Sequence, residues 1–176
     1  MSMTLIETKT LASATTAIEF TSIPSTFTDL SLKMLLRSDS NTFFTDNNNF
    51  TVNGTTSGYS MIGIFNGANS FNASGSSIKF SLLQGAQTTS NSFTAVDFYI
   101  PNYSGSTNKT FGWQSSTETQ TTTDGYYIML MAGLLTNTAP ISSIRFNSGA
   151  GNFVVGSTIS LYGITKGSDG IVTTSP

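Results

Sequence analysis

The stretch FTDLSLKMLLR, residues 27–37, alternates apolar and polar side chains along the chain. One face of an extended chain would carry Leu30, Leu32, Met34 and Leu36. The other face would carry Phe27, Asp29, Ser31, Lys33, Leu35 and Arg37. A period of two with one apolar face is typical of a half-buried β-strand. The window also holds an apolar run that would suit a helix, but its Thr and Ser residues and the preceding Pro24 favour the strand.

The same alternation of apolar and polar residues recurs along the chain. In FTAVDFYI, residues 93–100, the side chains again alternate between two faces, and Pro101 ends the strand because proline cannot donate to a ladder. Further strands are expected at residues 5–11, 17–21, 60–65, 78–83, 109–115, 126–135, 141–147 and 157–165. Regular strands without intervening amphipathic helices are typical of sandwiches and jelly rolls. We therefore predict an all-β fold, a single antiparallel β-sandwich of jelly-roll type with about 8–10 strands.

Three segments carry more specific expectations. Residues 38–58, SDSNTFFTDNNNFTVNGTTSG, are rich in turn formers, and both Asn47–Asn49 and Asn53-Gly54 predict turns, with short edge strands at 43–44 and 50–52. The apolar run YYIMLMAGLL, residues 126–135, predicts a buried strand pair or one long central strand. The stretch STISLYGIT, residues 157–165, predicts a central strand that is buried on both faces.

Composition limits the classes of partner. Only 9% of residues are charged and the net charge is −2, while Ser and Thr together account for 56 of the 176 residues. Seven scattered Lys and Arg residues cannot form a phosphate-binding stripe, so we expect no nucleic acid partner. The longest apolar run is half a membrane span, so we expect no membrane insertion. The opening MSMTLIETKT lacks the basic and apolar regions of a secretory signal.

The sequence contains few residues of the types that commonly act in catalysis or bind metal ions. The chain contains no His and no Cys, which excludes Ser-His and Cys-His nucleophilic catalysis and the zinc sites that use those ligands. A glycosidase would need two carboxylates facing one cleft, and Glu19 and Asp97 are strand residues that could in principle meet. We favour the alternative, in which both are strand carboxylates that face solvent. Asp39 and Asp46 could supply oxygen ligands for calcium, although an EF-hand spacing is missing and a plain turn is favoured. We predict a protein that is not an enzyme and uses no cofactor and no metal.

Aromatic residues offer one candidate binding site. Trp113, the single tryptophan, follows Tyr103 closely in the sequence, and rings exposed on a sheet are suited to stacking on sugars. Together with Asn49 in the Asn47–Asn53 loop, these residues form a candidate contact for a glycan or a protein partner. In the alternative interpretation, which we favour, Trp113 fills one end of the sandwich core.

Three stretches taken in order resemble small β-sandwich virion proteins of tailed bacteriophages. They are AIEFTSIPSTFTDLSLKMLLRSD (17–39), FYIPNYSGSTNKTF (98–111) and ISSIRFNSGAGNFVVGSTISLYGITKG (141–167). The matching positions are framework residues, so they indicate a fold and a kind of particle and no particular chemistry. The resemblance implies a jelly-roll protein on the exterior of the virion, in a family whose members are capsid decoration (cement) proteins or tail-associated structural proteins.

From this resemblance we expect a capsid decoration protein that binds the outer surface of the phage head and stabilises it. The expected partners are the major capsid protein and two further copies of the chain in a homotrimer, and the expected location is the virion capsid surface after synthesis in the host bacterial cytoplasm. The alternative is a tail-associated or host-glycan-binding jelly-roll module. We expect one domain over residues 1–176, with residues 1–12 as a possible docking strand or arm and 167–176 as a polar C-terminal tail.

Overall fold

The computed structural model describes residues 2–66, 69–118 and 125–166, and in these ranges every regular element is a β-strand. The twelve strands are β1 (Ser2–Thr10), β2 (Ala17–Phe20), β3 (Asp29–Leu36), β4 (Phe44–Val52), β5 (Tyr59–Phe65), β6 (Asn69–Gly75), β7 (Ile78–Gln84), β8 (Thr94–Ile100), β9 (Lys109–Glu118), β10 (Tyr126–Leu135), β11 (Ile144–Asn147) and β12 (Thr158–Thr165). The prediction of an all-β protein is confirmed. The same ranges contain no helix with the length and hydrophobicity of a membrane span.

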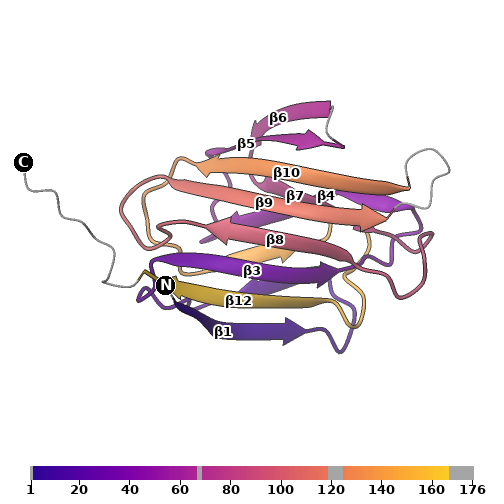
Figure 1. Ribbon diagram of the computed structural model, residues 1–176, viewed down its shortest axis with the longest axis horizontal. Helices are drawn as coiled ribbons and strands as arrows, with labels where there is room; N and C mark the ends of the chain where they lie inside the picture. Colours follow the sequence, from indigo (N-terminus) through magenta and orange to yellow (C-terminus); the bar gives the residue numbers. More distant parts are fainter. Residues whose placement is uncertain (1, 67–68, 119–124, 167–176) are drawn as a thin grey trace, which may run out of the picture.

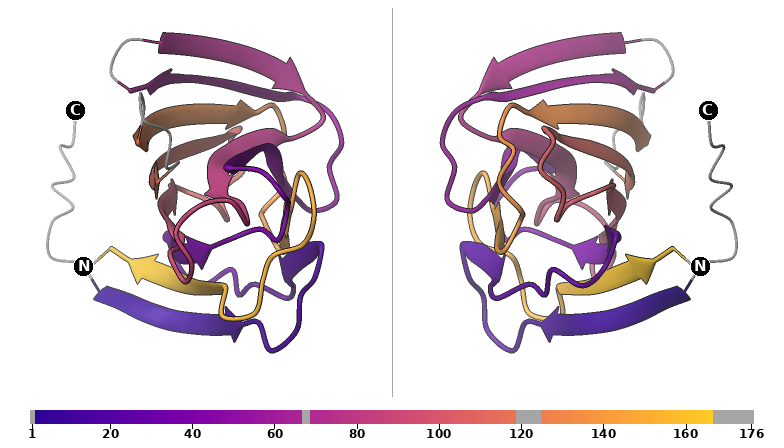
Figure 2. Two further views of the ribbon diagram at one scale, coloured as in Figure 1. Left: turned by 90° about the vertical axis from the view of Figure 1, so that its right-hand side faces the viewer. Right: turned by 90° about the vertical axis from the view of Figure 1, so that its left-hand side faces the viewer.

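The strands form two antiparallel sheets that pack face to face as a sandwich (Figure 1). The larger sheet has the order β1-β12-β3-β8-β9-β10-β5-β6, and the smaller has the order β2-β11-β4-β7. Figure 2 shows that the larger sheet curves around the smaller one. The inner faces of both sheets supply the core, which leaves two outer faces with different surfaces.

The strand order is that of a jelly roll with additions. From β2 to β5 the chain alternates between the sheets, β6 pairs with β5 in the larger sheet, and β7 returns to the smaller one. Later in the chain, β11 enters the smaller sheet between β2 and β4. The larger sheet keeps β3 on one side of β8 and the pair β5 and β6 on the other. Where a simple jelly roll has one strand, this chain has the three-strand meander β8-β9-β10, and β12 and β1 extend the sheet beyond β3. These additions explain why the twelve strands described exceed the predicted 8–10.

The strand predicted from residues 27–37 is confirmed as β3. Its inward side chains, Leu30, Leu32, Met34 and Leu36, are all buried. The alternation predicted for residues 93–100 is confirmed in the same way, since Thr94, Val96, Phe98 and Ile100 are the buried residues of β8. A period of two was therefore sufficient to identify the core face wherever polar and apolar residues alternate.

The turn predicted at Asn47–Asn49 is wrong, because these residues lie within β4. The register of β4 with β7 is interrupted on both sides of Asn48, and the irregularity turns the Asn48 side chain inward. Its Nδ2 donates to the carbonyl oxygens of Thr45 (2.7 Å) and Ser81 (3.1 Å), while its Oδ1 accepts the N–H of Gly149 (2.9 Å). The buried amide thus replaces backbone bonds that the bulged strand loses. The turn predicted at Asn53-Gly54 is present, and both residues have positive φ.

The final strand differs from its prediction. β12 lies next to the edge strand β1 rather than in the centre of the sheet, and it is buried on one face only, with Ser160, Tyr162 and Ile164 half-buried on the other. The predicted N-terminal arm forms β1 over Ser2–Thr10 and pairs with β12 of its own sheet. The predicted tail at 167–176 lies outside the described residues.

A layer of aromatic rings joins the two sheets. Phe50 of β4 lies 4.9 Å from Phe98 of β8, 5.2 Å from Phe111 of β9 and 5.3 Å from Phe146 of β11, measured between ring centroids. The ring of Phe98 also stacks on Trp113, with centroids 5.1 Å apart and planes at 17°. Each such pair contributes about 0.5–1.5 kcal/mol beyond the area that it buries.

The three stretches that resemble phage virion proteins meet at one end of the sandwich. Tyr103, fully buried in the loop between β8 and β9, donates its hydroxyl to the carbonyl oxygen of Pro24 and accepts the N–H of Ile141 on its own carbonyl (3.0 Å). The Phe27 ring lies against Gly163 of β12. Residues far apart in sequence therefore form one packed corner, which agrees with a framework role for them.

Arg37 organises the opposite end of β3. Its guanidinium donates to the carbonyl oxygens of Thr89 (2.7 Å), Ser92 (2.9 Å), Gly85 (2.9 Å) and Thr88 (3.3 Å). The side chain is buried, so these bonds replace hydration of the charge. One cation thereby fixes the whole loop between β7 and β8.

Substitution Gly163→Ala should lower the free energy of unfolding by about 1–3 kcal/mol, because a Cβ at this position would overlap the Phe27 ring. Urea unfolding followed by Trp113 fluorescence measures this. In a Phe27→Ala background the same substitution should cost much less, since the obstruction is gone. An equal cost in both backgrounds would contradict the packing described for this corner.

Substitution Arg37→Met should destabilise the protein by about 2–4 kcal/mol, because several carbonyl groups lose a charged donor. Lys33→Met is the matched control, since Lys33 forms only an exposed ion pair with Asp97 and should cost no more than about 1 kcal/mol. Urea unfolding of both variants gives the comparison. Equal losses would show that the Arg37 bonds to the loop do not contribute beyond an exposed ion pair.

Candidate interaction surfaces

The outer face of the larger sheet carries an unusual group of apolar side chains. Ile62 and Ile64 of β5 and Ile128 and Leu130 of β10 all point outward and are exposed. The strand register places Leu130 directly opposite Ile64. Antiparallel sheets usually present polar residues on the face that meets solvent. We call these four residues the β5–β10 apolar face.

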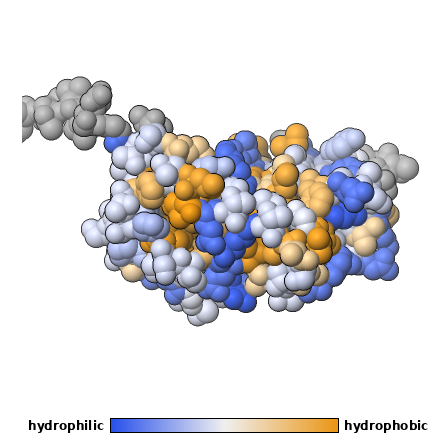
Figure 3. Space-filling view, turned by 90° about the horizontal axis from the view of Figure 1, so that it is seen from below, coloured by the Kyte–Doolittle hydropathy of each residue, from blue (hydrophilic) through white to orange (hydrophobic). Residues whose placement is uncertain are grey.

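The outer face of the same sheet has a shallow groove at its centre, and the two charged side chains in the groove neutralise each other. A groove of about 540 Å³ runs across β12, β3, β8 and β9 toward Ile128. Lys33 and Asp97 form an ion pair inside it, directly opposite each other in the β3–β8 register. Because the two charges cancel, this part of the outer face offers little net charge to a partner. Viewed from the β1 edge, Figure 3 shows hydrophobic patches separated by a hydrophilic band.

A second polar group on this face is Asp29, whose side chain is fully buried at the start of β3. Its Oδ2 accepts the hydroxyl of Tyr99 (2.7 Å), and its Oδ1 accepts the backbone N–H of Asn102 (2.9 Å). Lys166 lies 3.8 Å from the same carboxylate. Desolvation, followed by the hydrogen bond to Asp29 and the charge of Asp29, raises the pKa of Tyr99 to about 12.

The outer face of the smaller sheet is polar throughout its centre. Arg145 of β11 pairs with Glu19 of β2 (3.0 Å) and donates to Asn147 (2.9 Å), which in turn donates to Asn49 of β4 (3.1 Å). Lys79 of β7 is exposed opposite Asn49 in the register. This face is a cross-strand ladder of hydrogen bonds with no apolar patch of comparable size among the side chains described.

The predicted contact residues do not form a site. Trp113 points into the core, where only 3% of its surface is exposed, and Tyr103 is fully buried in the corner described above. Asn49 lies half-buried on the outer face of the other sheet. Neither aromatic ring is available to stack on a sugar, so these three residues do not provide a glycan contact. The indole N–H of Trp113 has no hydrogen-bond partner among the described residues.

The carboxylates proposed for catalysis or metal binding are also separated. Glu19 lies on the outer face of the smaller sheet and Asp97 on that of the larger sheet, so they cannot face one cleft. Asp39 accepts the N–H and the side-chain amide of Asn152 (2.7 and 3.0 Å), and these bonds lower its pKa. Over residues 2–66, 69–118 and 125–166, no group of three or more acidic residues is placed to hold a metal ion. Asp124 and Asp169 lie outside these ranges.

Sequence analysis missed the β5–β10 apolar face. The run YYIMLMAGLL is apolar on both faces, and such runs are typical of strands that are covered on both sides. The structure covers only one side, where Met129, Met131 and Leu135 are buried. The surplus of apolar residues in 126–135 was therefore the available signal, and no element among the described residues covers the other side.

No protein-family model matches this sequence, and no curated protein matches it. A solved structure described as "NanB plus Optactamide" aligns with 98% of this chain at 14% sequence identity and a TM-score of 0.38. The chain spans 28% of the length of that protein. A likeness at this level carries no argument about function.

The raised pKa of Tyr99 predicts a stability change at alkaline pH. The pKa of Tyr99 is about 12 in the folded protein, against about 10 for an unfolded tyrosine. The contribution of Tyr99 to the stability of the fold is therefore complete below pH ~10 and is lost as the pH rises toward 12. Tyr99→Phe should remove the phenolate transition near pH 12 from the absorbance titration and should flatten the loss of stability in that range. An unchanged titration would contradict the assignment.

Proposed function

We propose that this protein is a non-enzymatic structural subunit of a tailed-phage virion, a decoration protein that binds the outer surface of the head and stabilises it. The observation that carries the proposal is the β5–β10 apolar face, which belongs to a rigid sheet and has no partner within the described chain. The resemblance of three framework stretches to virion proteins supports the kind of particle, and the jelly-roll fold agrees with it.

The chemistry of the face suits contact with another protein. Exposed apolar residues on two neighbouring strands gain free energy when water is removed from them, at roughly 25 cal/mol per Å². The adjacent groove contains one self-compensated ion pair, so few charges must be desolvated on docking. We assign this face to the major capsid protein.

Binding of this kind stabilises a shell by mass action. A subunit that binds the expanded lattice and not its precursor shifts the equilibrium toward the expanded state. Three copies joined around a local symmetry axis would each contact capsid subunits, and their effective concentration would strengthen a weak individual contact. Catalysis is not needed for this role.

Sedimentation of the purified protein, alone and with expanded, undecorated capsids of the source virus, tests the proposal. The expected result is a trimer that co-sediments with capsids and saturates at a fixed stoichiometry. A protein that remains in the supernatant at every concentration would contradict a decoration role.

The double substitution Ile62→Glu with Leu130→Glu should weaken capsid binding at least about ten-fold, because it places two charges in the proposed contact. Both residues are exposed, so the fold should persist, and urea unfolding checks this. Lys79→Glu on the opposite face is the matched control, since it changes the net charge by the same two units. If the control loses binding and the double variant keeps it, the assigned face is wrong.

A further inference from the structure

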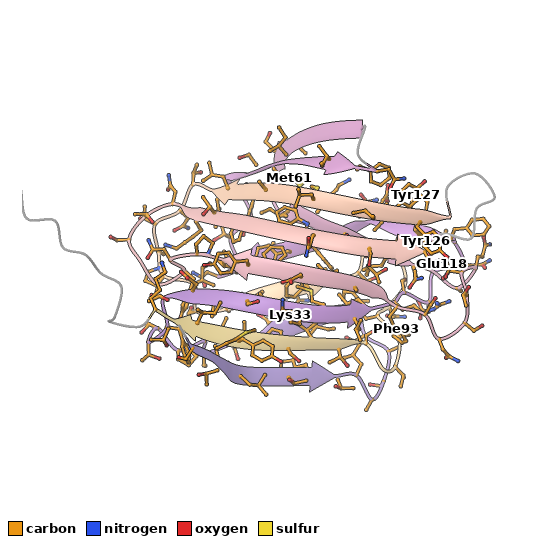
Figure 4. All side chains as sticks on the ribbon, viewed as in Figure 1. Lys33, Met61, Phe93, Glu118, Tyr126 and Tyr127 are labelled. Carbon is orange, nitrogen blue, oxygen red and sulfur yellow. The ribbon has the colours of Figure 1, made fainter. Side chains whose placement is uncertain are left out.

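We propose that the ends of β8, β9 and β10 form a binding site for a neutral glycan, at residues other than the predicted Trp113, Tyr103 and Asn49. A hollow of about 600 Å³ lies there at the end of the sandwich, lined by residues of both sheets. This volume lies within the range of small-molecule sites. Figure 4 shows Phe93, Glu118, Tyr126 and Tyr127 together at this end of the sandwich. The proposal does not depend on the capsid role.

The sheet register brings aromatic and acidic groups together. Glu118, the last residue of β9, is paired with Tyr126, the first residue of β10. Phe93 precedes β8, two residues before Ala95, and Ala95 is paired with Ser116 two residues before Glu118. The strand alternation therefore places Phe93, Glu118 and Tyr126 in a row on the outer face. Tyr126 is 75% exposed, so its ring is available as a stacking surface.

The polar side of the hollow is held in position by the loop that Arg37 fixes. Glu118 accepts the hydroxyl of Thr89 on Oε1 (2.8 Å) and lies 3.3 Å from the hydroxyl of Ser92 through Oε2. The guanidinium of Arg37 binds the carbonyl oxygens of both Thr89 and Ser92. A ligand would therefore meet a carboxylate whose orientation is already fixed, which lowers the entropy cost of binding.

Gln84 adds a second, independent indication of a ligand. It lines the hollow, is only 2% exposed, and its Oε1 has no hydrogen-bond partner among the described residues. Its Nε2 donates to Ser92 Oγ (3.0 Å) and to Glu118 Oε2 (3.3 Å). Because a carboxylate only accepts, this bond fixes the amide orientation and leaves Oε1 as the unpaired acceptor. Buried polar groups normally have a partner, which a hydroxyl of the ligand or a bridging water would supply.

These groups select a ligand that donates hydrogen bonds and has an apolar face. A pyranose ring meets both conditions, since its hydroxyls can donate to Glu118 and Gln84 while its C–H face stacks on Tyr126. The residues that line the hollow include no Lys and no Arg. The positive charge of Arg37 is already committed to backbone carbonyls. A sugar carboxylate or phosphate would therefore face Glu118 without a counter-charge, so we assign neutral rather than acidic glycans.

A glycan array followed by saturation-transfer NMR tests the site on the full chain. The probes are neutral hexose and N-acetylhexosamine oligosaccharides, with sialylated and uronate-containing oligosaccharides as the acidic set. We expect binding within the neutral set and none in the acidic set. Absence of any neutral ligand at millimolar concentration, or a preference for the acidic set, would overturn the proposal.

Single substitutions test whether the neutral glycan binds at this hollow. Tyr126→Ala should weaken binding of the neutral ligand at least ten-fold, because the stacking surface is removed, and Glu118→Gln should weaken it because the charged acceptor is lost. Leu5→Ala is the matched control, since it removes an exposed apolar side chain from the edge strand β1, which lines neither the hollow nor the β5–β10 apolar face. Equal affinity of Tyr126→Ala and the control would place the site elsewhere. Capsid co-sedimentation of the same variants distinguishes loss of the glycan site from loss of the decoration role.

Discussion

Contact between aromatic rings from two sheets is the interaction on which the rest of this structure depends. Phe50 from the smaller sheet packs against Phe98 and Phe111 from the larger one, and Trp113 extends the layer. The chain has no cysteine, so no disulfide supplements this packing. Since a large core ring that is truncated typically costs about 3–5 kcal/mol, the inner faces have little freedom to change. Recognition is therefore left to the outer faces and the strand ends.

The outer face of the smaller sheet is polar, whereas that of the larger sheet is partly apolar. On the smaller sheet, Glu19, Arg145 and Asn147 bond with one another across strands and leave a hydrated surface. On the larger sheet, Ile64 and Leu130 are exposed, and no element in the described part of the chain covers them. A low charge content is consistent with this division, because a surface that is buried in an assembly is less costly to desolvate when it carries few ions.

The sequence was sufficient to predict the core face where polar and apolar residues alternate, as in β3 and β8. It was insufficient where a residue acts through distant partners. Asn48 lies in a run of turn formers, yet its bonds to Ser81 and Gly149 hold it inside a strand. The sequence also could not predict that Trp113 is buried and Tyr126 is exposed. Periodicity separates the two faces of a strand but does not indicate which face the rest of the chain covers. Glu118 and Gln84 meet only through the fold, and no local motif marks them.

The environment of Arg37 has a consequence for the conditions under which the loop between β7 and β8 keeps its shape. Among the bonds described, its guanidinium is held by neutral oxygens, including the carbonyls of Gly85 and Thr89, and by no carboxylate. A guanidinium stays charged and carbonyl groups do not titrate, so acidification removes neither partner. A bond to Asp or Glu is weakened when acid protonates the carboxylate, whereas the bonds from Arg37 to these carbonyl groups should persist. The anchor that Arg37 gives the loop between β7 and β8 is thus preserved in acidic surroundings.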